Sequence, residues 1–263
     1  VGKSALQDNT EGGYNTAVGN YSLTNNTGSG ATNNTSVGYY SLGANTTGSE
    51  LTALGGYALY GNTTASYNTA LGYSAAYTNT TGDRMVAVGY QALKLSTTAD
   101  ANTAVGYRTL FSTTTGYNNT GMGFDCMLDN TTGHSNVAMG LQALANNTTG
   151  AENTAVGYRA LETATTADNN TAFGRLAMFA QTTGGLNTAV GAAAMQSSTT
   201  GANNTAIGTT ACSSLTTASD ACALGYVALY SLTTGNNNVG VGVGAGYAIT
   251  GGANNICVGK DSG

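Results

Sequence analysis

The amino-acid sequence predicts an all-β chain, a parallel β-solenoid (β-roll) of about fifteen coils with 17 residues each. Three observations predict this fold. A glycine preceded by an apolar residue recurs every 17 residues along the chain. The 263 residues include 39 glycines and no proline. Thr and Asn are abundant and no apolar stripe of helical period is present, which disfavours helices.

The repeat has the consensus N-T-A-V-G-Y-x-A-L-x-x-N-T-T-G-x-N, with the recurring glycine at position 5. Every interval between successive glycines is 17 except that from Gly19 to Gly38, which is 19. The two extra residues fall in the loop around Gly28, Ser29 and Gly30. The position-5 glycines are Gly2, Gly19, Gly38, Gly55, Gly72, Gly89, Gly106, Gly123, Gly140, Gly157, Gly174, Gly191, Gly208, Gly225, Gly242 and Gly259.

Each coil is expected to contain two short extended segments, T-A-V at positions 2–4 and Y-x-A-L at positions 6–9. The glycine at position 5 and the T-T-G turn separate them. Position 4 is always apolar and position 2 is mostly Thr or Val, so both are expected to face the core, because alternate residues of a strand share a face. Positions 3 and 8 are small, so the opposite face must be closely approached.

Stacked coils would follow one another at the strand spacing of ~4.8 Å. Asn stands at position 1 in twelve of fifteen copies, including Asn15, Asn34, Asn68 and Asn102. Stacked amides of this kind are expected to hydrogen-bond along a ladder. Position 13 is Thr throughout. Residues 1–263 are thus interpreted as a single β-solenoid repeat domain, and as a segment of a longer fibre because both ends fall inside a repeat.

A coil of 17 residues encloses few apolar side chains, so one solenoid has little to bury. The small residues and a row of aromatic residues at position 6 indicate a further packing surface. We therefore expect a homo-oligomer, with a trimer favoured, or an end-to-end filament. The aromatic residues of this row include Tyr39, Tyr73, Tyr90, Tyr107, Tyr158 and Tyr226.

The composition excludes several classes of function. Charged residues make up 7% of the chain, against roughly 25% in ordinary globular proteins, so the surface must be hydrated through hydroxyls and amides. That composition favours an extracellular structural protein. Seven basic residues, scattered along a chain of net charge −5, do not form a nucleic-acid site. No run of about 20 apolar residues is present, so no membrane span is expected.

The run N-T-A-V-G, as in Thr154-Ala155-Val156-Gly157, resembles the head repeats of trimeric autotransporter adhesins and the shafts of phage and large-virus tail fibres. The resemblance covers nearly the whole chain through positions 2 to 5. It implies a left-handed parallel β-roll assembled as a trimer. The adhesin unit is nearer 14 residues, whereas this one has 17, and neither a coiled-coil stalk nor a self-cleaving chaperone domain is present in the 263 residues.

No catalytic, cofactor-binding or metal-binding residues are expected, and the chain is not predicted to be an enzyme. The single histidine, His134, lies at the variable position 16 and is interpreted as an exposed turn residue. The glycine-rich stretch 240–246 superficially matches a phosphate loop, but the 17-residue register continues through it. Asp100 and Asp168 share position 16 but form no continuous acidic ladder for calcium.

The four cysteines, Cys126, Cys212, Cys222 and Cys257, fall at four different repeat positions. No two of them would be stacked in neighbouring coils, so free buried thiols are favoured over disulfides. Their spacing matches no metal site.

Asn-x-Thr acceptors for N-glycosylation recur in two sets. Both positions also suit Asn and Thr simply as turn residues, and that alternative stays open. The position-12 set is Asn45, Asn62, Asn79, Asn130 and Asn147, and the position-17 set is Asn33, Asn118, Asn169 and Asn203.

The leading hypothesis is an extracellular fibre or adhesin shaft, on a cell surface or a virion, whose turns meet a cell-surface or glycan receptor or another fibre. The alternative is an ice- or carbohydrate-binding β-solenoid that uses its Thr and Asn ladders. Ice-binding solenoids present Thr-x-Thr, whereas the two Thr of each turn here are adjacent and would point in opposite directions.

Overall fold

The computed structural model describes residues 1–263 and contains fifteen three-residue β-strands and no helix. The chain forms two compact units, Val1–His134 and Ser135–Gly263. The first unit contains β1 (Thr16–Val18), β2 (Thr35–Val37), β3 (Thr52–Leu54), β4 (Thr69–Leu71), β5 (Val86–Val88), β6 (Thr103–Val105) and β7 (Thr120–Met122). The second unit contains β8 (Val137–Met139), β9 (Thr154–Val156), β10 (Thr171–Phe173), β11 (Thr188–Val190), β12 (Thr205–Ile207), β13 (Cys222–Leu224), β14 (Val239–Val241) and β15 (Ile256–Val258).

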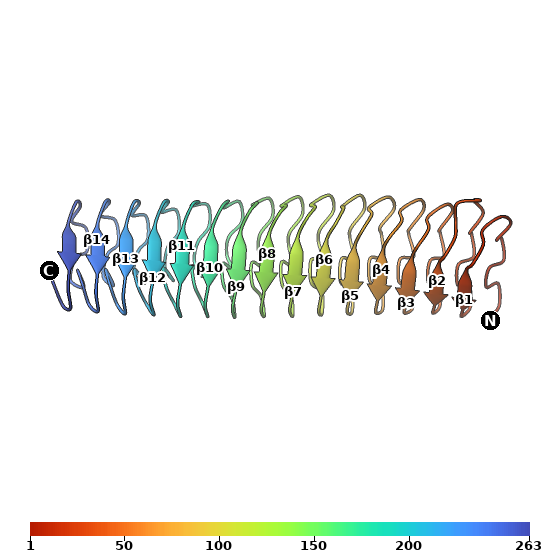
Figure 1. Ribbon diagram of the computed structural model, residues 1–263, viewed down its shortest axis with the longest axis horizontal. Helices are drawn as coiled ribbons and strands as arrows, with labels where there is room; N and C mark the ends of the chain where they lie inside the picture. Colours follow the sequence, from red (N-terminus) through yellow and green to blue (C-terminus); the bar gives the residue numbers. More distant parts are fainter. The chain divides into compact units, whose positions relative to one another are not determined.

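Within each unit the strands pair in parallel and in chain order, one strand per coil (Figure 1). Pairing joins identical repeat positions, so that Thr52 lies opposite Thr69. Between β1 and β2, Thr16 pairs with Thr35, and the loop at Gly28 absorbs the two extra residues without changing the register. The predicted β-solenoid with 17-residue coils is confirmed.

The prediction of a second extended segment is wrong, because positions 6–9 fold into consecutive tight turns. The amides of Ala58, Tyr60 and Asn62 donate to the carbonyls three residues before them, at 3.2, 3.3 and 3.1 Å. Tyr57 and Leu59, the third residues of the first two turns, have φ of 59° and 49°, as a type II turn requires a positive φ there.

These turns nevertheless contribute to the stack. The amide of Leu59 donates to Ala75 in the next coil at 2.9 Å, and that of Tyr57 donates to Tyr39 in the preceding coil at 2.8 Å. Hydrogen bonds between coils therefore continue beyond the three strand residues.

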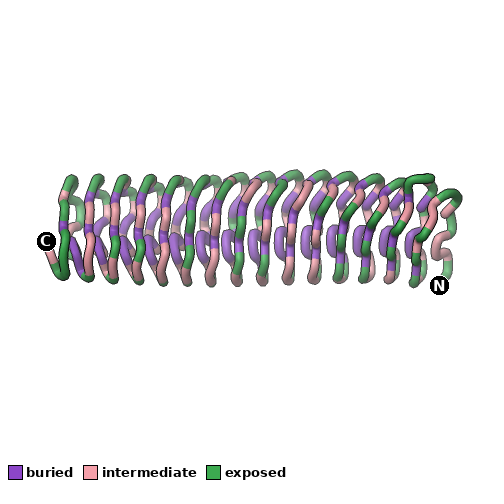
Figure 2. The backbone as a smooth tube through the Cα atoms, in the orientation of Figure 1, coloured by how far each residue is buried: buried purple, intermediate pink, exposed green.

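The core lies on the opposite strand face from the one predicted. Position 3 is buried in every strand, whereas positions 2 and 4 are half-buried or exposed (Figure 2). Ala53, for example, is buried between Thr52 and Leu54, whose side chains point outward. The turns of positions 6–9 pack so close to the inner face of the strand that only a small side chain fits at position 3. Most of the larger core residues sit at position 9, such as Leu42, Leu93 and Leu161.

Two ladders of asparagine complete the interior. In the first unit, Asn45, Asn62 and Asn79 at position 12 each donate through Nδ2 to the Oδ1 of the preceding asparagine, at 2.8, 2.9 and 3.1 Å. At position 1 of the second unit, Oδ1 of Asn170 accepts from the backbone amide and Nδ2 of Asn187, both at 3.1 Å. The predicted amide ladder at position 1 is confirmed. These buried amides are satisfied by one another, which matters because an unpaired buried polar group is costly.

Candidate interaction surface

The outward side of the strands forms the most regular surface of each unit, here termed the outer strand face, made by positions 2 and 4. Position 2 supplies a row that is mostly Thr, and position 4 a row of aliphatic, Met and Phe side chains. Because the strands pair in register, each row repeats at the ~4.8 Å strand spacing. The result in each unit is a row of hydroxyls beside a row of apolar groups.

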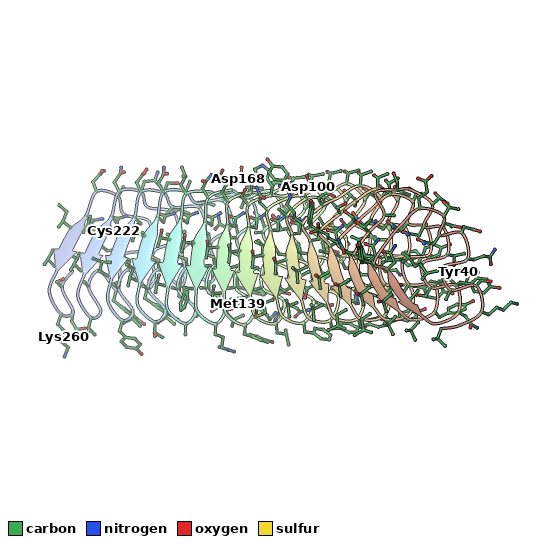
Figure 3. The ribbon with its side chains drawn as sticks, turned by 45° about the vertical axis from the view of Figure 1, so that its right-hand side comes forward. Tyr40, Asp100, Met139, Asp168, Cys222 and Lys260 are labelled. Carbon is green, nitrogen blue, oxygen red and sulfur yellow. The ribbon has the colours of Figure 1, made fainter.

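The apolar row is substantially open to solvent. Leu54 and Phe173 expose 45% and 55% of their surface, although both are large hydrophobic residues. Contiguous exposed apolar surface on a folded protein marks an interaction site. Exposed members of the row are Val18, Leu54, Leu71 and Met122 in the first unit and Met139, Phe173, Ile207, Leu224 and Val258 in the second. Figure 3 labels Met139 of this row and Cys222 of the neighbouring position-2 row.

Position 6 adds an aromatic row just past the glycine that ends each strand. In the first unit Tyr73, Tyr90, Tyr107 and Phe124 stack in sequence, with ring centroids 5.8, 5.3 and 4.8 Å apart. Their planes lie within 13° of parallel. All four side chains are exposed. In these coils position 6 is therefore an exposed row of stacked aromatic rings, and its role as a packing surface between chains stays a prediction.

Further tyrosines fill position 7 near the start of the first unit. Tyr21 stacks on Tyr40 at 4.6 Å, and Tyr40 on Tyr57 at 5.9 Å (Tyr40 is labelled in Figure 3). Burial, followed by the neighbouring tyrosines, raises the pKa of Tyr40 and Tyr57 above the usual value. Both phenols therefore stay neutral at physiological pH and can donate hydrogen bonds.

The position-12 glycosylation set does not fit this structure. Asn45, Asn62, Asn79, Asn130 and Asn147 are all fully buried. Nδ2, the atom that a glycan would occupy, donates within the coil, as from Asn62 to the carbonyl of Ala65 at 3.0 Å. The folded coil leaves no room for a sugar there. In contrast, the position-17 set of Asn33, Asn118, Asn169 and Asn203 is exposed, at φ of 55° to 59°.

The ladders named in the alternative hypothesis are mostly internal. Both asparagine ladders are buried, and the position-13 hydroxyls donate to the next coil, as from Thr46 Oγ1 to the carbonyl of Thr63 at 2.9 Å. Exposed threonines occur at position 14, such as Thr47 and Thr64, and in part of the position-2 row, such as Thr52. Sequence reasoning missed that row because it assigned position 2 to the core.

The remaining candidates have structural roles. His134 is half-buried, not exposed as expected, and stacks on Tyr117 at 4.7 Å. Asp100 Oδ1 accepts from the amide of Asp83 at 2.8 Å, and Asp168 Oδ1 from that of Ala151 at 2.7 Å, so position-16 carboxylates cap the preceding coil. The glycine-rich stretch 240–246 begins inside β14 (Val239–Val241), which pairs in register with β13 and β15.

None of the four cysteines forms a disulfide. Cys126, Cys212 and Cys257 are buried, whereas Cys222 is half-buried on the outer strand face of β13. Burial raises the pKa of the Cys126 and Cys212 thiols to about 12.

Comparison with protein-family models and with curated proteins found no match for the chain. The structure has no helix long and apolar enough to cross a membrane.

Proposed function

We propose that this chain is a structural shaft, an extracellular fibre or adhesin segment of a cell surface or virion, that assembles with further copies of itself through the outer strand face. The observation that carries the proposal is the exposed apolar row of position 4. In a single chain this row faces water along the length of each unit, and association would cover it.

The bonds in the interior support a role of the stacked coils as a stiff spacer. Parallel strand pairing, turn-to-turn hydrogen bonds and two asparagine ladders connect each coil to its neighbours in the same unit. Each coil contacts only adjacent coils, so stiffness accumulates along the stack as in other solenoids. Such an interior suits a spacer, and it does not constrain the residue types of the exposed turns.

We favour a trimer. Three outer strand faces turned toward a common axis would bury the position-4 rows against one another. The resemblance of the N-T-A-V-G repeat to trimeric adhesin heads and tail-fibre shafts supports the same number. The exposed turns at positions 14 and 17 would then point outward toward a cell-surface or glycan receptor, and N-glycosylation remains a prediction for the position-17 asparagines alone.

The test is the oligomeric state of the purified chain by sedimentation equilibrium. We expect a trimer for the natural sequence and a monomer for the double variant Leu54→Glu with Leu71→Glu, because charges on this row cannot be buried without partners. The matched control, Thr64→Glu with Thr81→Glu, adds the same charge to exposed turns of the same coils and should remain trimeric. Unchanged far-ultraviolet circular dichroism would show that the monomeric variant is folded. A natural chain that is monomeric throughout the concentration range would overturn the proposal.

Ice binding is a second candidate, because the position-2 threonines stand in a regular exposed row on the outer strand face. Thr35, Thr52 and Thr69 are exposed and pair in register. This candidate predicts thermal hysteresis that Thr52→Tyr abolishes. Thermal hysteresis is therefore measured on the natural chain and on Thr52→Tyr. The variant Leu54→Glu with Leu71→Glu is not used for this assay, because its changes alter the same face.

A further inference from the structure

The first unit carries a surface groove of about 440 Å³ that belongs neither to the outer strand face nor to the core. Its lining comes from the three successive coils that contain β3, β4 and β5. This volume lies within the range of ~300–1,000 Å³ that is common for small-ligand sites. The groove is lined by Tyr57, Tyr73, Ser74, Tyr77, Tyr90, Gln91 and Lys94.

A change at a single repeat position creates the groove. Position 7 is tyrosine in three successive coils, at Tyr21, Tyr40 and Tyr57, and then becomes Ser74 and Gln91. Positions 6 and 10 keep large side chains on both sides. The floor therefore drops between two walls, and Tyr57 closes one end.

The walls and the floor differ in chemistry. Tyr73 and Tyr90 of position 6 form one wall, and their rings stack 5.8 Å apart. Tyr77 and Lys94 of position 10 form the other wall. Lys94 Nζ lies 5.5 Å from the centre of the ring of Phe111, the position-10 residue of the next coil. The floor is formed by Ser74, which is almost fully buried, and by Gln91, which is half-buried and offers its amide. Several aromatic side chains thus surround a small number of hydrogen-bonding groups, the usual composition of a ligand pocket.

The charge of the lining is opposite to that of the chain. The chain has a net charge of −5, yet the only ionic side chain lining the groove is the cation Lys94. Burial and its tyrosine neighbours raise the pKa of Tyr57, so its hydroxyl stays uncharged. A ligand that matches this lining has an apolar face, several hydroxyls and a negative charge.

We propose that this groove binds an acidic sugar, namely a pyranose that carries a carboxylate, as a unit of an acidic polysaccharide. The C–H face of the ring would pack on the tyrosine rings, its hydroxyls would meet the Gln91 amide and the tyrosine hydroxyls, and its carboxylate would meet Lys94. This binding site is independent of the assembly through the outer strand face, and its failure would leave that assembly untouched.

The test uses saturation-transfer-difference NMR on the whole chain, with trigalacturonate as the acidic probe and maltotriose as the neutral one. We expect trigalacturonate to bind with a dissociation constant of about 1 mM and maltotriose to bind more weakly. Lys94→Gln should weaken trigalacturonate binding roughly fivefold and remove the preference over maltotriose. No saturation transfer to trigalacturonate, or equal binding of the two sugars by the natural chain, would overturn the proposal.

A second variant locates the site. Ser74→Tyr restores the tyrosine that stands at position 7 in the three preceding coils, so it should fold while filling the groove. It should abolish trigalacturonate binding. Ala193→Tyr makes the same addition at position 7 in the second unit and should leave binding unchanged. Binding that survives Ser74→Tyr in a folded protein would place the sugar elsewhere and refute the assignment.

Discussion

The methyl group of Thr109 occupies the space that a side chain on Gly121 would need. Thr109 is at position 8 of one coil, and Gly121 is at position 3 of the next. A Cβ on Gly121 would lie 2.7 Å from Thr109 Cγ2 and 3.1 Å from Met127 Cε. Elsewhere both positions are usually alanine, as in Ala75 and Ala87. The gain of atoms at one position is thus matched by a loss at the other.

This compensation predicts a coupled pair of mutations. Gly121→Ala should lower the free energy of unfolding by about 1–3 kcal/mol, because it overpacks a tight site. In a Thr109→Ala background, which recreates the alanine pair, the same change should cost far less. A coupling energy of about 0.5–3 kcal/mol is expected from urea unfolding of the four proteins. Effects that simply add would show that Thr109 does not set the size limit at Gly121.

The glycine that ends each strand allows a sharper comparison between two neighbours. Gly55 has a φ of 141°, and a Cβ there would lie 2.5 Å from the carbonyl oxygen of Gly72 in the next coil. Gly56 has an ordinary φ, and a Cβ there would only touch the Tyr73 ring at 3.4 Å. Gly55 is therefore constrained both by its backbone conformation and by the adjacent coil, whereas Gly56 is not.

We expect Gly55→Ala to destabilise the chain by more than about 3 kcal/mol, since neither the backbone nor the neighbouring carbonyl can move without breaking the stack. Gly56→Ala should be neutral or stabilising by up to about 1 kcal/mol, because alanine restricts the unfolded chain. Thermal unfolding of both variants tests the pair. Similar melting temperatures for the two would contradict the role assigned to position 5.

Much of the fold could be predicted from the sequence because stacking fixes each repeat position chemically. The 17-residue period, the 19-residue exception at Gly28–Gly30 and the position-1 amide ladder all follow from residues that recur in register. A repeat exposes such constraints many times over, so a single chain is enough to see them.

The orientation of the strand could not be read from hydrophobicity alone. An apolar position 4 usually indicates a core, and here it indicates an outer face. The decisive signal was the restriction of positions 3 and 8 to small residues, since a narrow coil excludes large side chains more strictly than polar ones. The groove at Ser74 was missed because it depends on the contrast between neighbouring coils, which a consensus averages away.

The left-handed residues at position 17 offer a test of local strain. Glu50 is exposed with a φ of 56°, a conformation that costs L-residues other than Asn and Gly roughly 1–2 kcal/mol. Glu50→Asn should raise the free energy of unfolding by about 0.5–1 kcal/mol, and Glu50→Val should lower it by at least as much. Urea unfolding of protein from a bacterial host, which adds no glycan at the new Asn, measures both. A stabilising valine would contradict the strained geometry.

The buried thiols predict how stability depends on alkaline pH. Burial raises the pKa of Cys126 and Cys212 from 9.0 to about 12 in the folded chain, so folding favours the neutral thiol. The unfolded chain loses these protons from pH 9 upward, before the folded one does. The stabilisation is therefore fully present below pH 9 and is lost as the pH rises toward 12, with a loss on the order of 1 kcal/mol per thiol at pH 10.

The double variant Cys126→Ala with Cys212→Leu introduces the residues that other coils carry at positions 8 and 9 and removes both thiols. Tyr40 and Tyr57, whose raised pKa acts in the same direction, are retained in both proteins. The difference between the two curves of unfolding free energy against pH therefore isolates the cysteines, whatever the change in stability at pH 7. We expect the curve of the natural chain to fall more steeply between pH 9 and 11. Parallel curves would mean that the thiols ionise as readily in the folded coils as in the unfolded chain.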